Sequence, residues 1–133
     1  MYEVTVIYDD KNEDTIICES KPTFDVDGGF VFVECGKGQS LSLNIDNFTK
    51  LKVKYPLPTV MPAFKYSINI NYDTETEDVE LLFSPSTVDV SIEGEDDGYT
   101  PVILVKEGEN VCRVINSTYL KSIKVTTYSE KDK

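Results

Sequence analysis

The chain has 133 residues and a formal net charge of −11, from 24 acidic and 13 basic side chains. This sign disfavours direct binding to nucleic acid, which requires a positive surface against the phosphates. The sequence contains no histidine. The commonest general base and the commonest metal ligand are therefore missing, and an enzyme would depend on carboxylates, Lys, Tyr or Cys.

The first predicted strand spans residues 2–8, where apolar side chains alternate with more polar ones. A period of two with one polar face is typical of a half-buried strand. The acidic residues 9–14 should form the turn of a hairpin with a second strand at 15–19. Pro22 and the Asp27-Gly28-Gly29 turn delimit a short third strand. The other strands expected in this half are 30–35, 41–45 and 51–55, with a single helical turn around 46–50.

Two segments, Phe30–Cys35 and Val102–Lys106, are continuous apolar runs. Such runs are typical of central strands that are buried on both faces. In the second half, the alternation seen at residues 41–45 is lost, because Arg113 stands at the position that corresponds to Leu41. A one-residue register slip within residues 111–116 would restore the pattern.

The two halves of the chain resemble each other. Residues 2–26 align without a gap on residues 66–90, and nine of the 25 pairs are identical. After Val26 the offset rises from 64 to 72, so that residues 30–53 align with 102–125. Chance similarity between two strand-rich segments is the alternative. An ungapped match across turns as well as strands favours duplication of one small β-module.

We therefore expect an all-β fold of two tandem five-stranded modules packed with pseudo-twofold symmetry, as a sandwich or as two fused small barrels. Residues 56–64 contain three of the six prolines and predict an extended connector. Leu57, Val60 and Met61 in this connector favour packing on the modules. The expected divisions are a first module (1–55), the connector (56–64), a second module (65–128) with an acidic insertion at 91–98, and a polar tail (129–133).

The negative charge is concentrated in three segments. Residues 9–14 sum to −3, residues 73–80 to −5 and residues 93–97 to −4, which leaves about +1 for the rest of the chain. All three segments fall at predicted turns or at their edges. The candidate partner-binding residues are Asp9, Asp10, Glu13, Asp14, Asp73, Glu75, Glu77, Asp78, Glu93, Glu95, Asp96, Asp97 and Tyr99.

The leading hypothesis is a non-enzymatic interaction protein whose acidic loops dock on a basic protein surface. It could inhibit a nucleic-acid-binding factor, with carboxylates in place of phosphates. A compact acidic β-chain of this kind resembles accessory proteins of bacteriophages and other mobile elements, and the resemblance identifies no family. The simplest alternative is that acidic turns only keep the protein soluble and protect strand edges.

Two further functions stay open. One is a structural subunit of a virion or other assembly, which would form oligomers through strand edges and the connector. The other is a small-ligand-binding protein or an enzyme that uses a groove between the modules. Size-exclusion chromatography would separate the first from a monomeric interaction protein.

No motif predicts a catalytic residue, a cofactor or a metal. Residues 73–78 place oxygen ligands at alternate positions, but the glycine and the flanking helices of a calcium-binding EF-hand are missing. Gly36-Lys37-Gly38 lacks the frame of a phosphate loop. Cys18 and Cys112 lie in strand-like segments, which predicts small buried side chains rather than reactive thiols.

The start of the chain lacks the basic residues and the long apolar core of a secretory signal. No apolar run reaches the roughly 20 residues that cross a bilayer. The three cysteines are an odd number without a close pair and suit a reducing compartment. We therefore expect a cytoplasmic protein without a membrane partner, or a component of a virion if its role is structural.

Overall fold

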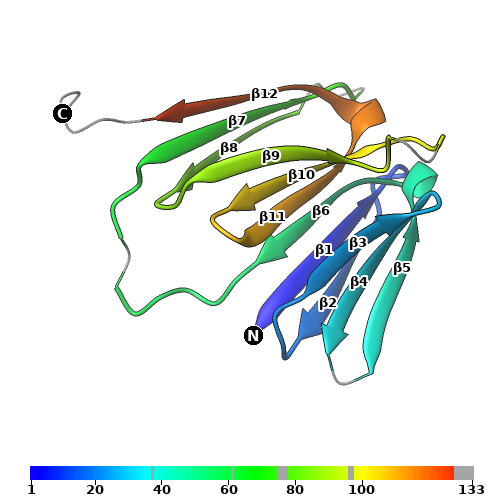
Figure 1. Ribbon diagram of the computed structural model, residues 1–133, viewed down its shortest axis with the longest axis horizontal. Helices are drawn as coiled ribbons and strands as arrows, with labels where there is room; N and C mark the ends of the chain where they lie inside the picture. The colour runs from blue at the N-terminus through cyan, green and yellow to red at the C-terminus, as the bar shows by residue number, and fades with distance from the viewer. Residues whose placement is uncertain (37, 61, 75–77, 96–97, 128–133) are drawn as a thin grey trace.

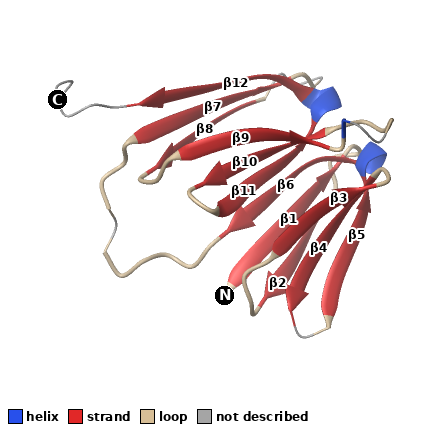
Figure 2. Ribbon diagram, in the orientation of Figure 1, coloured by secondary structure: helices blue, strands red, loops and turns tan. Residues whose placement is uncertain are grey.

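The computed structural model describes residues 1–36, 38–60, 62–74, 78–95 and 98–127, and in these residues the fold is all-β, as predicted. Short 3₁₀ turns, η1 (Ile45–Asn47) and η3 (Ser117–Tyr119), accompany the strands (Figure 2). No described helix is long and apolar enough to cross a bilayer. The strands are β1 (Tyr2–Tyr8), β2 (Glu13–Cys18), β3 (Thr23–Asp27), β4 (Phe30–Gly36), β5 (Gln39–Asn44), β6 (Phe48–Lys54), β7 (Tyr66–Tyr72), β8 (Val79–Ser84), β9 (Val88–Glu93), β10 (Val102–Glu107), β11 (Asn110–Asn116) and β12 (Leu120–Thr127).

These strands form one large sheet and two small ones. The central six-stranded sheet has the order β2-β1-β6-β11-β10-β9, and the three-stranded sheets have the orders β3-β4-β5 and β12-β7-β8. One core, which includes Val31 and Leu51, lies between β3-β4-β5 and the central sheet. A second core, which includes Ile68 and Val105, lies between β12-β7-β8 and the opposite face. The small sheets therefore cover opposite faces at the two ends of the molecule (Figure 1).

Each half of the chain makes the same strand pairings. In the first half the orders are β2-β1-β6 and β3-β4-β5, and in the second half they are β8-β7-β12 and β9-β10-β11. The amide of Asp9 donates to the carbonyl of Asn47, and the amide of Asp73 donates to that of Tyr119 at the equivalent place. A duplication requires such correspondence, and common ancestry of the halves remains an inference from the sequence.

The turns before β6 and β12 are also built alike. The side chain of Asn44 accepts a hydrogen bond from the amide of Asp46, and that of Asn116 accepts one from the amide of Thr118, both at 2.9 Å. Asparagine is a preferred capping residue because its side-chain oxygen satisfies an amide that the turn leaves unpaired. The predicted helical turn around residues 46–50 is present as η1, one residue earlier.

The predicted number of strands in each module was wrong. Among the described residues each half contributes six strands rather than five. The short segment Thr23–Asp27 pairs along its whole length with β4 across the two-residue turn Gly28-Gly29. Both glycines have positive φ, which the twist of a tight hairpin requires. The short third strand expected from the sequence is therefore present, and the error lay in the total of five for each module.

The expected pseudo-twofold symmetry was also wrong. The halves meet where β6 pairs with β11, which is equivalent to β5 in the first half. A twofold axis would exchange the halves and would therefore require β5 to pair with β12 as well. These strands instead lie at the edges of two different small sheets. The halves are therefore arranged head to tail, and we call the β6–β11 pairing the joint.

Strands β10 and β11 lie in both cores. Val102, Leu104 and Val114 belong to the core of the first half, whereas Ile103 and Val105 belong to that of the second. Successive side chains of a strand point to opposite faces, so these strands are buried on both faces. The prediction made for the apolar run in β10 is confirmed for Val102–Val105.

The same prediction was wrong for β4. Val31, Val33 and Cys35 are buried, but Phe30 and Phe32 between them are 40% and 37% exposed. The outer face of β4 has no sheet packed on it, because the second half covers only the β6 end of the first module. The run is apolar throughout, yet only one of its faces is covered.

A shift in register is present within residues 111–116, where the sequence suggested one, but it does not have the expected effect. Val105 pairs with Arg113, whereas the next residue of β10 pairs with Val111, so that Cys112 is the extra residue of a β-bulge. Beyond the bulge the register is that of the first half, because Val105 pairs with Arg113 as Val33 pairs with Leu41. Arg113 therefore keeps the position of Leu41, and the lost alternation is not restored. The strand therefore keeps Val114 toward one core and Ile115 toward the other.

The connector does not pack on the modules, contrary to prediction. Leu57 and Val60 are 76% and 79% exposed, and Met61 lies outside the described residues. Figure 1 shows the segment after β6 bending away from the sheets before it returns to β7. Phe64 is in contact with Phe83, their ring centroids 5.7 Å apart, and is half exposed.

Because the first core contains residues of both halves, we predict that the two halves unfold together. Leu104 of the second half is 7% exposed in the core of the first, so Leu104→Ala should lower the free energy of unfolding by about 2–5 kcal/mol. Urea denaturation should show one transition for the variant, by tyrosine fluorescence and by circular dichroism. Leu81→Ala is the control, because Leu81 is 57% exposed and should change stability by only about 0.5 kcal/mol. Two separate transitions would contradict the shared core.

Candidate functional site

Three acidic connections lie at one end of the molecule. The amide of Asp9 in the β1–β2 turn bonds to η1, and the amide of Asp73 in the β7–β8 turn bonds to the end of η3. The β9–β10 connection reaches the same end, where the carbonyl of Pro101 accepts from the amide of Ser117. Figure 1 shows these connections beside the two 3₁₀ turns. We call this set of loops the acidic end.

The candidate residues differ in what the structure shows of them. Glu75, Glu77, Asp96 and Asp97 lie outside the described residues. The structure places the remaining acidic candidates at the acidic end and leaves all of them exposed: Asp9, Asp10, Glu13, Asp14, Asp73, Asp78, Glu93 and Glu95. The prediction that these segments fall at turns or their edges agrees with the strand bounds.

Two of the acidic turns line one groove. A cavity of about 600 Å³ is bordered by Asp9 and Glu13 from the first turn and by Asp78 from the second. It lies where β1 and β6 of the first half approach β7 of the second. Lys11 and Lys50 also line it, so the lining carries both carboxylates and ammonium groups. Charged groups of both signs at one place favour a polar or zwitterionic protein surface over an apolar ligand.

The β1–β2 turn is held by its own acidic side chains. The carboxylate of Asp10 accepts from the backbone amide of Asn12 at 3.0 Å and from its side-chain amide at 2.9 Å. The hydroxyl of Tyr8 donates to Asp14 at 3.1 Å. Partial burial and this carboxylate together raise the pKa of Tyr8. Asp10 and Asp14 thus support the shape of the turn, whereas Asp9 and Glu13 project from it.

Tyr99, directly after the acidic insertion, contacts the first half. Its ring lies against Gly29 so closely that an added Cβ there would come within 2.8 Å of Cδ1. The ring remains 56% exposed. Gly94, on the same connection, similarly approaches Val26. Through Tyr99 and Gly94 the β9–β10 connection therefore contacts the β3–β4 hairpin of the first half, and its described acidic side chains, Glu93 and Glu95, are exposed.

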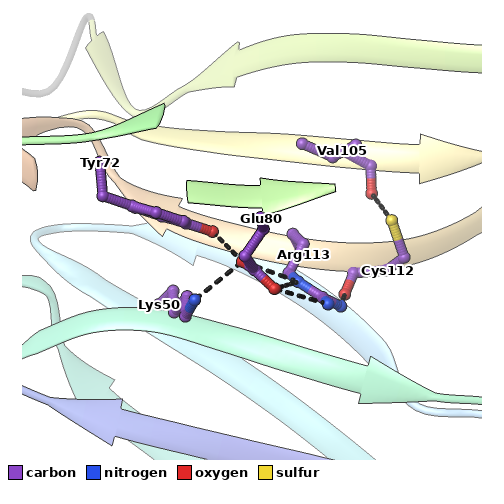
Figure 3. A network of polar contacts seen from close by, with 6 residues as sticks. All are labelled: Lys50, Tyr72, Glu80, Val105, Cys112 and Arg113. Atoms are coloured by element: carbon purple, nitrogen blue, oxygen red, sulfur yellow. Dashed lines mark hydrogen bonds and ion pairs between the residues drawn. The ribbon is translucent and has the colours of Figure 1, made fainter. Parts of the chain in front are cut away.

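A buried cluster of charged side chains lies at the joint (Figure 3). It was not predicted from the sequence. The carboxylate of Glu80 on β8 accepts from Lys50 Nζ at 2.8 Å and from Arg113 Nη2 at 3.0 Å. The hydroxyl of Tyr72 donates to the same carboxylate. Arg113 Nη1 also donates to the carbonyl of Cys112 at 2.8 Å. Strands β6, β7, β8 and β11 thus meet through one carboxylate.

The cluster shifts the pKa values of its members. Burial alone would raise the pKa of Glu80, but the hydrogen bonds from Arg113, Lys50 and Tyr72 outweigh burial and lower it to about 2. Burial lowers the pKa of Lys50, which Glu80 partly offsets. Burial and the Glu80 carboxylate both raise the pKa of Tyr72. Glu80 is therefore ionised and paired, and its charge does not belong to the acidic end.

A signal for Glu80 was present in the sequence. It stands two residues before Leu82 on a strand of period two, so it lies on the inward face of β8. Its equivalent in the first half, at an offset of 64, is the apolar Ile16. Because Glu80 follows the acidic turn directly, it was counted among the exposed charges of that turn. A carboxylate on a core face instead requires a buried partner.

The three cysteines are buried and free, as predicted for Cys18 and Cys112. Burial raises the pKa of both thiols to about 12. The thiol of Cys112 donates to the carbonyl of Val105 at 3.3 Å. A thiol with so high a pKa carries almost no thiolate at neutral pH and is a poor nucleophile. Within the described residues, no group of three His, Cys, Asp or Glu side chains is placed to hold a metal ion.

Comparison of the chain with protein-family models, with curated protein sequences and with solved structures gave no match. The functional argument therefore depends on the geometry and charge of this chain alone.

The ion cluster predicts a specific loss of acid stability. The pKa of Glu80 is lower in the folded chain than the ordinary value of 4.5, so its contribution is present above that value and is lost as the pH falls toward 2. Glu80→Gln should lower the free energy of unfolding at pH 7 by roughly 3–5 kcal/mol, because Lys50 and Arg113 stay buried without a counter-ion.

Urea denaturation at pH values from 2 to 7 would measure this contribution. The variant should show a flatter dependence of stability on pH below the ordinary carboxyl pKa. Glu93→Gln removes an exposed carboxylate and is the control, which should leave both stability and its pH dependence nearly unchanged. Equal effects of the two substitutions would contradict the assigned role of Glu80.

Proposed function

We propose that this protein is a non-enzymatic interaction module that docks its acidic end on a basic protein surface. The observation that carries the proposal is the convergence of three acidic connections, far apart in sequence, on one end of the sandwich. Carboxylates at protruding loops raise the rate of encounter with a basic partner, because the field they create extends beyond the contact itself.

Some residues of the acidic end hold the loops in place while others remain exposed, which supports a rigid docking surface. Asp10 and Asp14 hold the β1–β2 turn through hydrogen bonds, and Tyr99, directly after the insertion, packs on Gly29. Loops that are fixed before binding lose little conformational entropy when a partner docks. Asp9, Asp73 and Glu93 are exposed and project from three different connections. These side chains would make the ionic contacts.

Tyr99 would supply the apolar part of the contact. Its ring is 56% exposed beside the acidic insertion, although one face rests on Gly29. Tyrosine is enriched among the residues that dominate protein interfaces, since its ring is large and rigid and its hydroxyl is polar. A nucleic-acid-binding protein fits this surface as a partner class, because such proteins present basic patches to phosphates.

The proposal predicts that capture of a partner depends on the acidic end and on salt. The variant Asp9→Asn with Asp73→Asn and Glu93→Gln removes one charge from each acidic connection. Affinity capture from a host lysate should recover less of the partner with this variant than with the original chain. The original chain should also recover less at high salt, because ions screen exposed charges.

The matched control removes three carboxylates elsewhere, as Asp89→Asn with Glu107→Gln and Glu109→Gln, on β9 and at the β10–β11 turn. Both variants carry the same net charge, so a difference between them isolates position from total charge. The proposal fails if the two variants capture the same proteins equally well, or if high salt leaves capture unchanged.

A further inference from the structure

The strands equivalent to those of the joint, β5 and β12, are each left with one unpaired edge. Inside the chain, β6 of the first half pairs with β11 of the second, and the central sheet has the order β2-β1-β6-β11-β10-β9. The strand equivalent to β6 is β12, and the strand equivalent to β11 is β5. Both are edge strands of three-stranded sheets. A head-to-tail contact that is used once inside a chain can be repeated between chains.

We propose that β12 of one copy pairs with β5 of the next, so that the chain assembles head to tail through a repeat of its own joint. The two small sheets would merge into a six-stranded sheet of order β8-β7-β12-β5-β4-β3. Under the correspondence of the halves, this is the order of the central sheet. The inference goes beyond docking on a basic protein, since the partner is a second copy of this chain.

Exposed apolar side chains occupy one side of the repeated contact. Inside the chain, the outer face of β10 inserts Val102 and Leu104 into the core of the first half, where they are 0% and 7% exposed. Their equivalents at an offset of 72 are Phe30 and Phe32 on β4, which are 40% and 37% exposed. The two rings stack on each other with centroids 6.1 Å apart. We call this pair the donor face.

The other side is the open end of the second core. In the first half, Leu51 and Val53 on β6 share their core with Val102, Leu104 and Val114 of the second half and are 0% and 6% exposed. At the equivalent of Val53, Val125 on β12 is 39% exposed, and Ile92 on the neighbouring edge strand β9 is 53% exposed. These residues form an acceptor end that lacks the cover present in the first half.

The register and the charges permit the pairing. Within the chain, Val114 lies opposite Leu51, and the equivalent pair between copies is Ser42 opposite Ile123. The buried cluster of Glu80, Lys50 and Arg113 has as its equivalents Ile16, Ser122 and Leu41. The repeated contact therefore replaces the ion cluster with apolar and small polar groups and buries no unpaired charge there.

The contact between copies should be weaker than the joint inside the chain. Gly94 of the insertion and Tyr99 directly after it add contacts between the halves, and the insertion has no equivalent in the first half. Each copy also carries a net charge of −11, so that copies repel one another at low salt. Assembly should therefore increase with both protein concentration and salt. Docking on a basic partner has the opposite salt dependence.

Sedimentation velocity on the intact chain tests the proposal. We expect monomers at low concentration and low salt, and a series of larger species as concentration and salt increase. The donor variant Phe30→Ser with Phe32→Ser and the acceptor variant Ile92→Ser with Val125→Ser should each weaken association by about tenfold or more. The control Leu81→Ser with Phe83→Ser removes two exposed apolar residues from β8 and should associate like the original chain.

An equimolar mixture of the donor and acceptor variants gives the sharpest result. Each variant retains one intact surface, so the mixture should form a dimer of one copy of each and nothing larger. Circular dichroism would confirm that every variant is folded. A monomer at millimolar concentration and high salt would overturn the proposal, as would equal weakening by the β8 control or a mixture that stays monomeric.

Discussion

The pairing of β6 with β11 determines where most of the buried side chains can lie. It joins the halves into one sheet, and the small sheets then pack on its opposite faces. Strands β10 and β11 contribute apolar side chains to both cores, so a substitution on either face disturbs the fold. The first half depends on Val102, Leu104 and Val114 of the second to complete its core. The second core, by contrast, is built from residues of the second half alone, so the dependence runs mainly in one direction.

Charge is arranged in two different ways around this joint. Glu80 is buried between Lys50 and Arg113, and the low dielectric around it makes the loss of any partner costly. The exposed carboxylates of the acidic end interact through water, where each pair contributes little to stability. The same residue type therefore fixes the arrangement of strands inside the molecule and provides a long-range field outside it. Only the exposed carboxylates are available to a partner.

The sequence predicted the local structure better than the contacts between the halves. Alternation identified β1 and β7, whereas the lost alternation near Arg113 marked the place of the bulge at Cys112 without being explained by it. Periodicity could not show which edge strands pair, and the symmetry was therefore predicted wrongly. The apolar runs of β4 and β10 look alike, yet only β10 has a sheet over each face. For the candidate site, the turns and their exposure followed from composition, whereas the role of Glu80 required its position on an inward face.

Amide hydrogen exchange at the joint tests the head-to-tail arrangement most directly. Strands β6 and β11 each have neighbours on both sides, so consecutive amides at 50–52 and 113–115 should be protected up to the free energy of global unfolding. In dilute solution at low salt, edge strands β5 and β12 should show protection only at alternate residues. The account is contradicted if residues 50–52 and 113–115 exchange as readily as the edge strands do.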